Sequence, residues 1–292
     1  MSNLSDFLGG AGGDLYIGLV NDSGFVQAFE GAGVAFVSDA AGVISYSLNG
    51  TTVAGTIIQG GYVSFTAGLW LSVGSFSAPN IYPSGLAFDG TNLISCDNIS
   101  DLIYIYDGVS PAVLSSFASA SESPSGLTFD GTNLISCGYA SDLIHIHSGV
   151  TGTILSSFSS PGATPSGLTF DGTNLISCDQ TTDTIYIHDG ITSTILSSFA
   201  SPSSTPYGLT FDGTNLISCD STSDLIYIHD GVSSTILSSF AAPSVSPAGL
   251  AFDGTNLISC NYSTGIIYTH LGITATTSGL SQNLLLTKLE SV

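Results

Sequence analysis

The chain has almost no basic residues. Of its 292 residues only one is Lys or Arg, against 22 Asp and Glu, which gives a formal net charge of −21. Proteins that hold nucleic acid phosphates need clustered Lys and Arg side chains. We therefore expect no nucleic-acid partner, and anionic membrane surfaces are equally poor partners. The carboxylates would keep the surface soluble and would attract cations such as Ca²⁺.

Long apolar runs and zinc-ligand motifs are also missing. Nowhere do 18 apolar residues follow one another, and the first residues lack the basic start and apolar stretch of a signal peptide. We expect neither membrane insertion nor classical secretion. The Cys-x-x-Cys and Cys/His spacings of zinc sites do not occur, and we expect no resident cofactor.

The cysteines are few and regularly placed. They occupy one position in successive repeats: Cys96, Cys137, Cys178, Cys219 and Cys260. Equivalent positions in neighbouring repeats would lie too far apart for disulfide bonds. The pattern predicts buried free thiols and synthesis in a reducing compartment.

A nine-residue segment, Phe-Asp-Gly-Thr-Asn-Leu-Ile-Ser-Cys, recurs every 41 residues. The copies begin at Phe88, Phe129, Phe170, Phe211 and Phe252. This period is typical of four-stranded propeller blades. In one copy we expect strands at residues 208–211, 215–219, 225–229 and 235–240, named A to D from first to last. The sequence predicts an all-β, five-bladed β-propeller.

The last repeat lacks its own D strand, because residues 276–279 do not match the Ile-Leu-Ser-Ser-Phe of the other copies. An unassigned segment with this pattern lies before the first repeat, at residues 69–76, and Phe76 precedes Phe117 by 41 residues. We expect this early strand to complete the fifth blade and close the ring without an unpaired edge.

Three regions follow from this organisation. Residues 1–68 carry no repeat, but β-like runs at 15–20, 34–38, 43–48, 52–58 and 62–66 predict a small β domain for attachment or assembly. Residues 69–272 form the propeller. Residues 273–292 are a tail, in which 284–289 could be a strand that docks on the N-terminal domain, on a partner subunit or within the chain.

The Phe-Asp-Gly-Thr-Asn-Leu turn resembles that of bacterial propeller repeats of the YVTN and NHL type, over about two thirds of the chain. This resemblance implies the propeller fold. The catalytic members, such as streptogramin-type lyases, place His and Glu in the centre, and the repeat has no such pair. We therefore expect a binding or structural module and no enzyme.

The opening residues 3–13 resemble the first residues of tailed-phage virion proteins, in which a short polar segment precedes a Gly-rich stretch and a β domain. The resemblance implies a virion protein that is assembled in the host cytoplasm and released by lysis. Its partners would be other virion subunits, bound through residues 1–68, and it would be a homo-oligomer on the particle.

Two repeated residue types could carry chemistry. Four histidines share one register of strand C, His147, His188, His229 and His270, where the first repeat has Tyr106. A metal or pH-switch site is conceivable there, but packing is favoured because Tyr replaces His in one copy. The Asp that opens each A-to-B turn suits a tight turn, and a Ca²⁺ site is the alternative.

The loops between B and C and between D and A vary most among the copies, and both emerge on one face of a propeller. Their polar and aromatic side chains can hydrogen-bond and stack on sugars. The candidate ligand-binding residues are Asp97, Asn98, Tyr139, Gln180, Tyr207, Asp220, Asn261 and Tyr262. Neutral drift of unconstrained loops after duplication is the alternative.

The function predicted from these features is that of a non-enzymatic phage fibre, spike or decoration subunit. Its propeller would bind a cell-surface glycan or protein, with weak affinity per site raised by several copies. A free-standing propeller lectin is the first alternative, and a lyase or hydrolase on a propeller scaffold is a distant second.

Overall fold

The computed structural model describes residues 34–38, 43–48, 51–58, 62–65 and 69–273, with side chains for residues 74–270. Contacts divide the chain into two units, of which Trp70–Ile273 is one. All elements in the described residues are strands. None of these residues forms a helix long and apolar enough to cross a membrane.

The strands before residue 69 form one antiparallel sheet in sequence order. They are β1 (Val34–Ser38), β2 (Val43–Leu48), β3 (Thr51–Ile58) and β4 (Tyr62–Phe65). Four of the five β-like runs predicted from the sequence therefore correspond to strands. The predicted runs at 15–20 and 284–289 lie outside the described residues.

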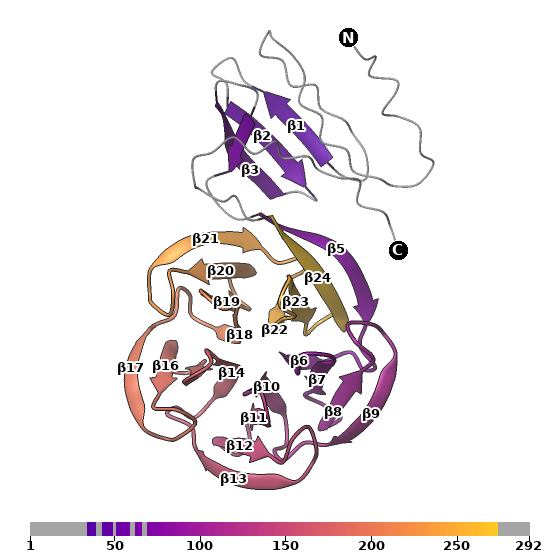
Figure 1. The fold of residues 1–292 in the computed structure, drawn as a ribbon, viewed down its shortest axis with the longest axis vertical. Coiled ribbons are helices and arrows are strands. Elements are labelled where there is room, and N and C mark those ends of the chain that lie inside the picture. The colour runs from indigo at the N-terminus through magenta and orange to yellow at the C-terminus, as the bar shows by residue number, and fades with distance from the viewer. Residues whose placement is uncertain (1–33, 39–42, 49–50, 59–61, 66–68, 274–292) are drawn as a thin grey trace. The chain divides into compact units, whose positions relative to one another are not determined.

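The second unit is a five-bladed β-propeller (Figure 1), as the sequence predicts. Each blade is an antiparallel sheet with strand A at the axis and strand D at the rim. Blade 1 consists of β6 (Pro83–Phe88), β7 (Leu93–Asp97), β8 (Leu102–Tyr106) and β9 (Val113–Ala118). Blade 2 consists of β10 (Pro124–Phe129), β11 (Leu134–Gly138), β12 (Leu143–His147) and β13 (Ile154–Ser159).

The next two blades repeat this plan. Blade 3 consists of β14 (Pro165–Phe170), β15 (Leu175–Asp179), β16 (Thr184–His188) and β17 (Ile195–Ala200). Blade 4 consists of β18 (Pro206–Phe211), β19 (Leu216–Asp220), β20 (Leu225–His229) and β21 (Ile236–Ala241). The observed strands agree with the predicted ones to within two residues at each end.

Blade 5 is built from both ends of the unit. Its A, B and C strands are β22 (Pro247–Phe252), β23 (Asn256–Asn261) and β24 (Ile266–Ile273), and its D strand is β5 (Leu69–Ser77). The Ala78 N–H donates to the carbonyl of Gly265 at 2.7 Å, which continues the pairing beyond the strand. The predicted closure is confirmed.

Burial decreases from the axis to the rim. Strands A and B are buried along almost their whole length, strand C alternates, and strand D is mostly exposed, with one half-buried Phe in every blade. The Leu and Ile of the repeated Leu-Ile-Ser-Cys segment, such as Leu134 and Ile135, are fully buried between neighbouring blades. Strands A and B thus lack a polar outer face because both faces of each sheet pack on another sheet, and the serines and threonines within them are buried too.

Glycine allows the A strands to approach one another at the axis. A Cβ added to Gly85 would lie 2.8 Å from the carbonyl oxygen of Ser125 in the next blade. The preceding serine links the same two blades, since Ser84 Oγ donates to the carbonyl of Pro124 at 2.6 Å. Strand A therefore repeats Ser-Gly wherever adjacent blades are linked in this way.

The aromatic register of strand C also joins adjacent blades. Phe117 of blade 1 packs on His147 of blade 2 with ring centroids 5.9 Å apart, and Phe76 of the closing strand packs on Tyr106. The Nδ1 of His147 lies 2.7 Å from the carbonyl of Thr151, so Nδ1 carries the proton and Nε2 accepts from the Ser136 hydroxyl. The packing interpretation accounts for these residues.

The five cysteines are free and buried, as predicted. Burial raises the pKa of the Cys96, Cys137 and Cys178 thiols to about 12. They fill small gaps beside the A strands, where the Cys219 thiol contacts the Ala248 carbonyl at 3.0 Å.

Candidate functional site

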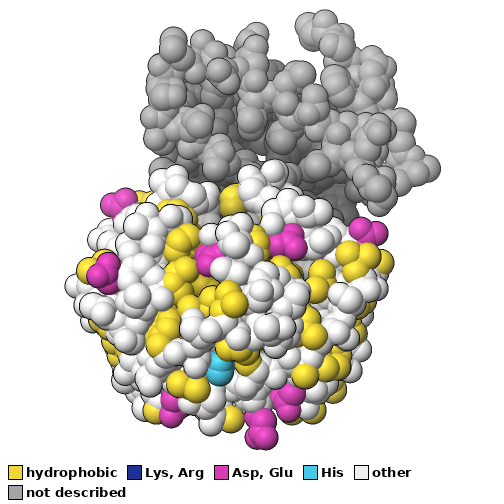
Figure 2. Space-filling model, turned by 60° about the horizontal axis from the view of Figure 1, so that its bottom comes forward, with side chains coloured by type: hydrophobic (Ala, Val, Ile, Leu, Met, Phe, Trp, Pro, Cys, Tyr) yellow, Lys and Arg dark blue, Asp and Glu magenta, His cyan; other side chains and the backbone are white. Residues whose placement is uncertain are grey.

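The connections between strands form two faces of the propeller. We call the side with the A-to-B and C-to-D turns the turn face, and the side with the B-to-C and D-to-A loops the loop face. On each face a backbone hydrogen bond joins the two kinds of connection. Leu93 N–H donates to the Gly108 carbonyl on the turn face, and Asn98 N–H donates to the Tyr82 carbonyl on the loop face. Figure 2 shows one side of the unit, on which acidic side chains stand apart and no basic side chain is visible.

On the turn face, the Asp that opens each A-to-B turn is part of the turn itself. The Oδ1 of Asp89 accepts from the Thr91 and Asn92 N–H groups at 2.9 and 2.7 Å, and Gly90 follows with a φ of 95°. All five blades repeat these bonds. The turn interpretation thus accounts for one carboxylate oxygen of each Asp. Within the described residues, no group of three or more His, Cys, Asp or Glu could hold a metal ion.

On the loop face, a second Asp clamps the B-to-C loop to the D-to-A loop. The Oδ1 of Asp220 accepts from Thr222 and Ser223 N–H, and its Oδ2 accepts from Thr205 N–H at 2.7 Å. Burial alone would raise the pKa of Asp220, but the N–H bonds from Ser223, Thr205 and Thr222 outweigh it and lower the pKa. Asp97 and Asp179 make the equivalent bonds.

Blades 2 and 5 modify the clamp. Asn261 keeps the two bonds from its own loop, to Ser263 and Thr264 N–H. In blade 2 the position is Gly138, and a Cβ there would lie 2.6 Å from the hydroxyl of Ser121, which occupies the space of the missing carboxylate. The space beside the loop backbone is therefore filled in every blade, but by different side chains: Asp in three blades, Asn261 in blade 5 and Ser121 in blade 2.

Three of the predicted ligand-binding residues are clamps: Asp97, Asp220 and Asn261 are only 3%, 1% and 2% exposed. The residue after each clamp is more exposed and differs in every blade except for one shared Tyr. These residues are Asn98, Tyr139, Gln180, Ser221 and Tyr262. The predicted face therefore holds two classes of residue, buried clamps and variable side chains at the surface.

Four tyrosines meet on the loop face, and we call them the tyrosine cluster: Tyr82, Tyr139, Tyr207 and Tyr262. The centroid distances are 5.1 Å for Tyr82 and Tyr262, 6.3 Å for Tyr207 and Tyr262, and 6.3 Å for Tyr139 and Tyr207. These residues come from blades 1, 2, 4 and 5. Contacts between opposite blades are possible only near the axis, so the cluster covers the centre of the loop face.

Two amides complete the cluster. Gln180 Nε2 donates to the Tyr139 hydroxyl at 2.9 Å, and the Tyr262 hydroxyl donates to Asn98 Oδ1 at 3.1 Å. Burial raises the pKa of Tyr139, Tyr207 and Tyr262, so the phenols stay neutral at physiological pH. The structure thus brings five of the eight predicted residues together in one uncharged aromatic and amide cluster, in which Tyr207 is buried at 8% exposure and the other four are half-buried.

The members of the tyrosine cluster stand at positions where most other repeats have a different residue. The other tyrosines of the propeller occupy strand C, namely Tyr104, Tyr106, Tyr186, Tyr227 and Tyr268. The cluster members come from three unrelated repeat positions: before the Pro of strand A, inside strand A, and after the clamp. Independent drift would scatter such changes over the loops, whereas these meet in space.

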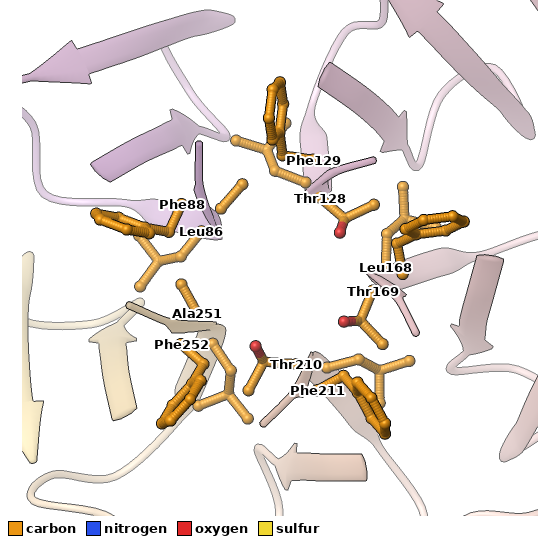
Figure 3. Close-up of a pocket in the computed structure, with 15 residues that line it drawn as sticks. Leu86, Phe88, Thr128, Phe129, Leu168, Thr169, Thr210, Phe211, Ala251 and Phe252 are labelled. Carbon is orange, nitrogen blue, oxygen red and sulfur yellow. The ribbon is translucent and has the colours of Figure 1, made fainter. Parts of the chain in front are cut away.

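A cavity lies at the axis on the side of the turn face. It measures about 90 Å³ and is lined by residues 86–88 of blade 1 and their equivalents in the other four blades. Figure 3 shows the hydroxyls of Thr128, Thr169 and Thr210 directed toward the axis. We call this cavity the threonine pocket.

Sequence reasoning did not identify Tyr82 as a site residue, nor the three threonines. Tyr82 follows no clamp and joins the cluster only by packing on Tyr262. A signal for the threonines exists in the repeat alignment, because Thr128, Thr169 and Thr210 occupy the position of Ala87 and Ala251 in strand A.

Comparison with known proteins places the fold. No family model matches the chain, and no curated protein matches it. The chain is similar to the glutaminyl cyclase of Myxococcus xanthus, with a TM-score of 0.61 and 13% identity over 70% of this chain and 96% of that one. It also matches the WD40 propeller domain of Doa1 with a TM-score of 0.47 and 11% identity, covering 82% of this chain and 92% of that one. The likeness to the glutaminyl cyclase, at 13% identity, shows a shared fold alone.

Proposed function

We propose that this protein is a non-enzymatic binding protein whose tyrosine cluster holds a neutral carbohydrate of a cell surface. The propeller fold is consistent with a binding or scaffold role. The observation that carries the proposal is the convergence of Tyr82, Tyr139, Tyr207 and Tyr262 from different repeat positions.

The chemistry of the tyrosine cluster suits a sugar. Aromatic faces pack on the C–H face of a sugar ring, and phenol and amide groups hydrogen-bond its hydroxyls. Asn98 and Gln180 supply those amides next to Tyr262 and Tyr139. The net charge of −21 would disfavour an acidic glycan, so the proposed ligand is uncharged.

The reactive groups of the propeller support a role without catalysis. The five thiols are buried, and the pKa of each is raised by that burial. His147, His188, His229 and His270 each bond a serine within the fold, and burial lowers their pKa. These groups are engaged in structure.

A glycan array with the full chain tests the proposal. We expect binding to a set of neutral glycans that is lost in the double variant Tyr139→Ala/Tyr262→Ala. Tyr227→Ala, a half-buried tyrosine of strand C outside the cluster, is the matched control and should bind as the wild type does. Tyr262→Phe keeps the ring and should retain most of the affinity. Unchanged binding by the double variant would overturn the choice of site.

A protein partner is the second candidate, and exposed apolar side chains favour it. Ile81, Ile99 and Val245 on the loop face are 59%, 65% and 61% exposed. Ile81 and Ile99 adjoin Tyr82 and Asn98 in the chain. If Ile81→Ser/Ile99→Ser abolishes binding to cells while the array shows no glycan, the ligand is a protein.

The biological setting that we propose is a phage virion, in which residues 1–68 attach copies of the chain to a particle. Its support is the resemblance of residues 3–13 to the first residues of tailed-phage virion proteins. Mass spectrometry of purified particles tests it. A fixed copy number with capsid or tail proteins would support a fibre or decoration subunit, and recovery from the soluble fraction alone would favour a free-standing lectin.

A further inference from the structure

We propose that the threonine pocket binds the ammonium group of a small primary amine. This site lies at the axis on the side of the turn face, and it is independent of the tyrosine cluster on the loop face. Neither the repeat pattern nor the fold requires its threonines, since alanine occupies the same position in two blades.

The first support is the state of the three hydroxyls. Thr128, Thr169 and Thr210 are only 7%, 4% and 6% exposed. Figure 3 shows their hydroxyl oxygens facing the axis. Within the described part of the chain these hydroxyls have no protein hydrogen-bond partner. The fully buried polar side-chain atoms without a partner in the described residues are His145 Nε2 and Asp183 Oδ1, so the threonine oxygens are open to the cavity, where they can bond water or a small ligand that replaces it.

The second support is the shape of the pocket. Its 90 Å³ is several times the roughly 10–15 Å³ that one water molecule requires, so a molecule of a few heavy atoms fits. The hydroxyls come from blades 2, 3 and 4, which are consecutive, whereas Ala87 and Ala251 of the adjoining blades 1 and 5 form the rest of the ring. The accessible lining of the cavity is almost entirely polar, so the pocket suits a small polar or charged group.

The third support is electrostatic. Asp89, Asp130, Asp171, Asp212 and Asp253 each follow directly on a phenylalanine that lines the pocket, so five carboxylates surround the axis on the turn face. Such a ring favours cations near the entrance and disfavours anions. A divalent metal ion would prefer carboxylate ligands inside the pocket, where the protein offers only neutral oxygens.

A primary ammonium group meets all three conditions. It carries one positive charge and three N–H donors, which equals the number of threonine hydroxyls available as acceptors. Strand A is also the inner edge of each sheet, so its unpaired backbone carbonyls near the axis can accept further hydrogen bonds.

The test is an NMR titration of the full chain labelled at threonine methyl groups, at pH 7. Propylammonium chloride should shift the methyl signals of Thr128, Thr169 and Thr210 and saturate in the millimolar range. Tetramethylammonium, which has the charge without N–H donors, and 1-propanol, which has the size without the charge, should bind at least tenfold more weakly. Equal binding of either compound, or of potassium ion, would overturn the proposal.

Isosteric variants locate the site. Thr169→Val removes one hydroxyl at constant shape and should weaken propylammonium binding about tenfold, which is the loss of one hydrogen bond to a charged group. Thr169→Ser restores the hydroxyl and should restore binding, and it also covers the case in which the valine variant folds poorly. Thr173→Val, a threonine of the A-to-B turn, is the matched control. Wild-type affinity in Thr169→Val would contradict the proposed site.

Discussion

Both faces of the propeller fix their connections with an Asp that accepts backbone N–H groups, but one face is constant in sequence and the other is variable. On the turn face, Asp212 Oδ1 accepts two backbone N–H groups, and the turn Asp-Gly-Thr-Asn is identical in every blade. On the loop face, Asp220 Oδ1 also accepts two backbone N–H groups, but the residue after the clamp changes from blade to blade. A carboxylate that fixes the backbone thus frees the next side chain to vary, and this separation lets near-identical repeats build an irregular surface.

Acid should have the largest effect on stability and should act on the turn face, because the turns there depend on neutral histidines. The Nδ1 of His188 bonds the Thr192 carbonyl of a C-to-D turn. Burial lowers the pKa of His147, His188 and His229, and lowers that of His270 to about 4. The unfolded chain, with pKa values near 6.5, binds more protons below that pH, so stability is full above about pH 6.5 and falls toward pH 4. His270 alone would contribute roughly 3 kcal/mol to the loss.

Thermal unfolding at constant ionic strength between pH 7.5 and 4.5 measures this effect. The variant His188→Tyr copies blade 1, where the Tyr106 hydroxyl bonds Ser95 at 2.9 Å. We expect it to fold and to show a smaller decrease in melting temperature with acid than the wild type. Identical pH profiles for the two proteins would refute a titration of the buried histidine.

Loss of a clamp should have the next largest effect. Asp220→Ala leaves the N–H groups of Thr205, Thr222 and Ser223 without their acceptor, and it empties the space of a carboxylate that is only 1% exposed. We expect the free energy of unfolding to decrease by about 2–4 kcal/mol. Asp220→Asn keeps the Oδ1 acceptor, as Asn261 does, and should cost less. Urea denaturation of the three proteins gives the order, and a milder loss in the alanine variant would contradict the clamp.

The corresponding change on the turn face should cost less. Asp212→Ala removes bonds to Thr214 and Asn215 N–H in a turn that is partly exposed, where water can replace the lost acceptor. We expect a decrease of about 1 kcal/mol in the free energy of unfolding. The same urea series measures it. A loss equal to that of Asp220→Ala would remove the distinction between the two faces.

The smallest effect concerns the thiols, which lie between the faces. Because burial raises the pKa of Cys96, Cys137 and Cys178 to about 12, the thiolate is scarce in the folded protein. We expect no alkylation by iodoacetamide at pH 8 in the native state and five modifications after unfolding, counted by mass spectrometry. Rapid native modification of any one would show local opening of its blade.

The repeat determines most of what could be predicted. Its 41-residue period, the alternation of strand C and the early copy of strand D sufficed for five blades and for their closure by β5. The site was predicted only in part, because Asp97 and Asn98 are both polar loop residues in the sequence. Only the fold shows that the Asp97 carboxylate accepts hydrogen bonds from the backbone, while the Asn98 side chain bonds Tyr262 of the last blade.

The meeting of distant chain segments explains the remaining gaps. Tyr82 and Tyr262 lie far apart in sequence and touch because blades 1 and 5 are neighbours. The threonines can be recognised as a group only when the five A strands surround one axis. In the sequence of a single strand, Thr in place of Ala gives no sign of a shared cavity. Spatial convergence is the property that a linear repeat does not display.

Because the fifth blade is built from both ends of the unit, closure of the ring does not depend on how many complete repeats lie between them. Strand β5 precedes every repeat, and β22 to β24 follow the last complete one. Gain or loss of a whole 41-residue unit in between would leave both halves of the closing blade in place. A gene built in this way could change ring size, or exchange one loop-face residue for another, by recombination between copies and without inventing a new closing strand.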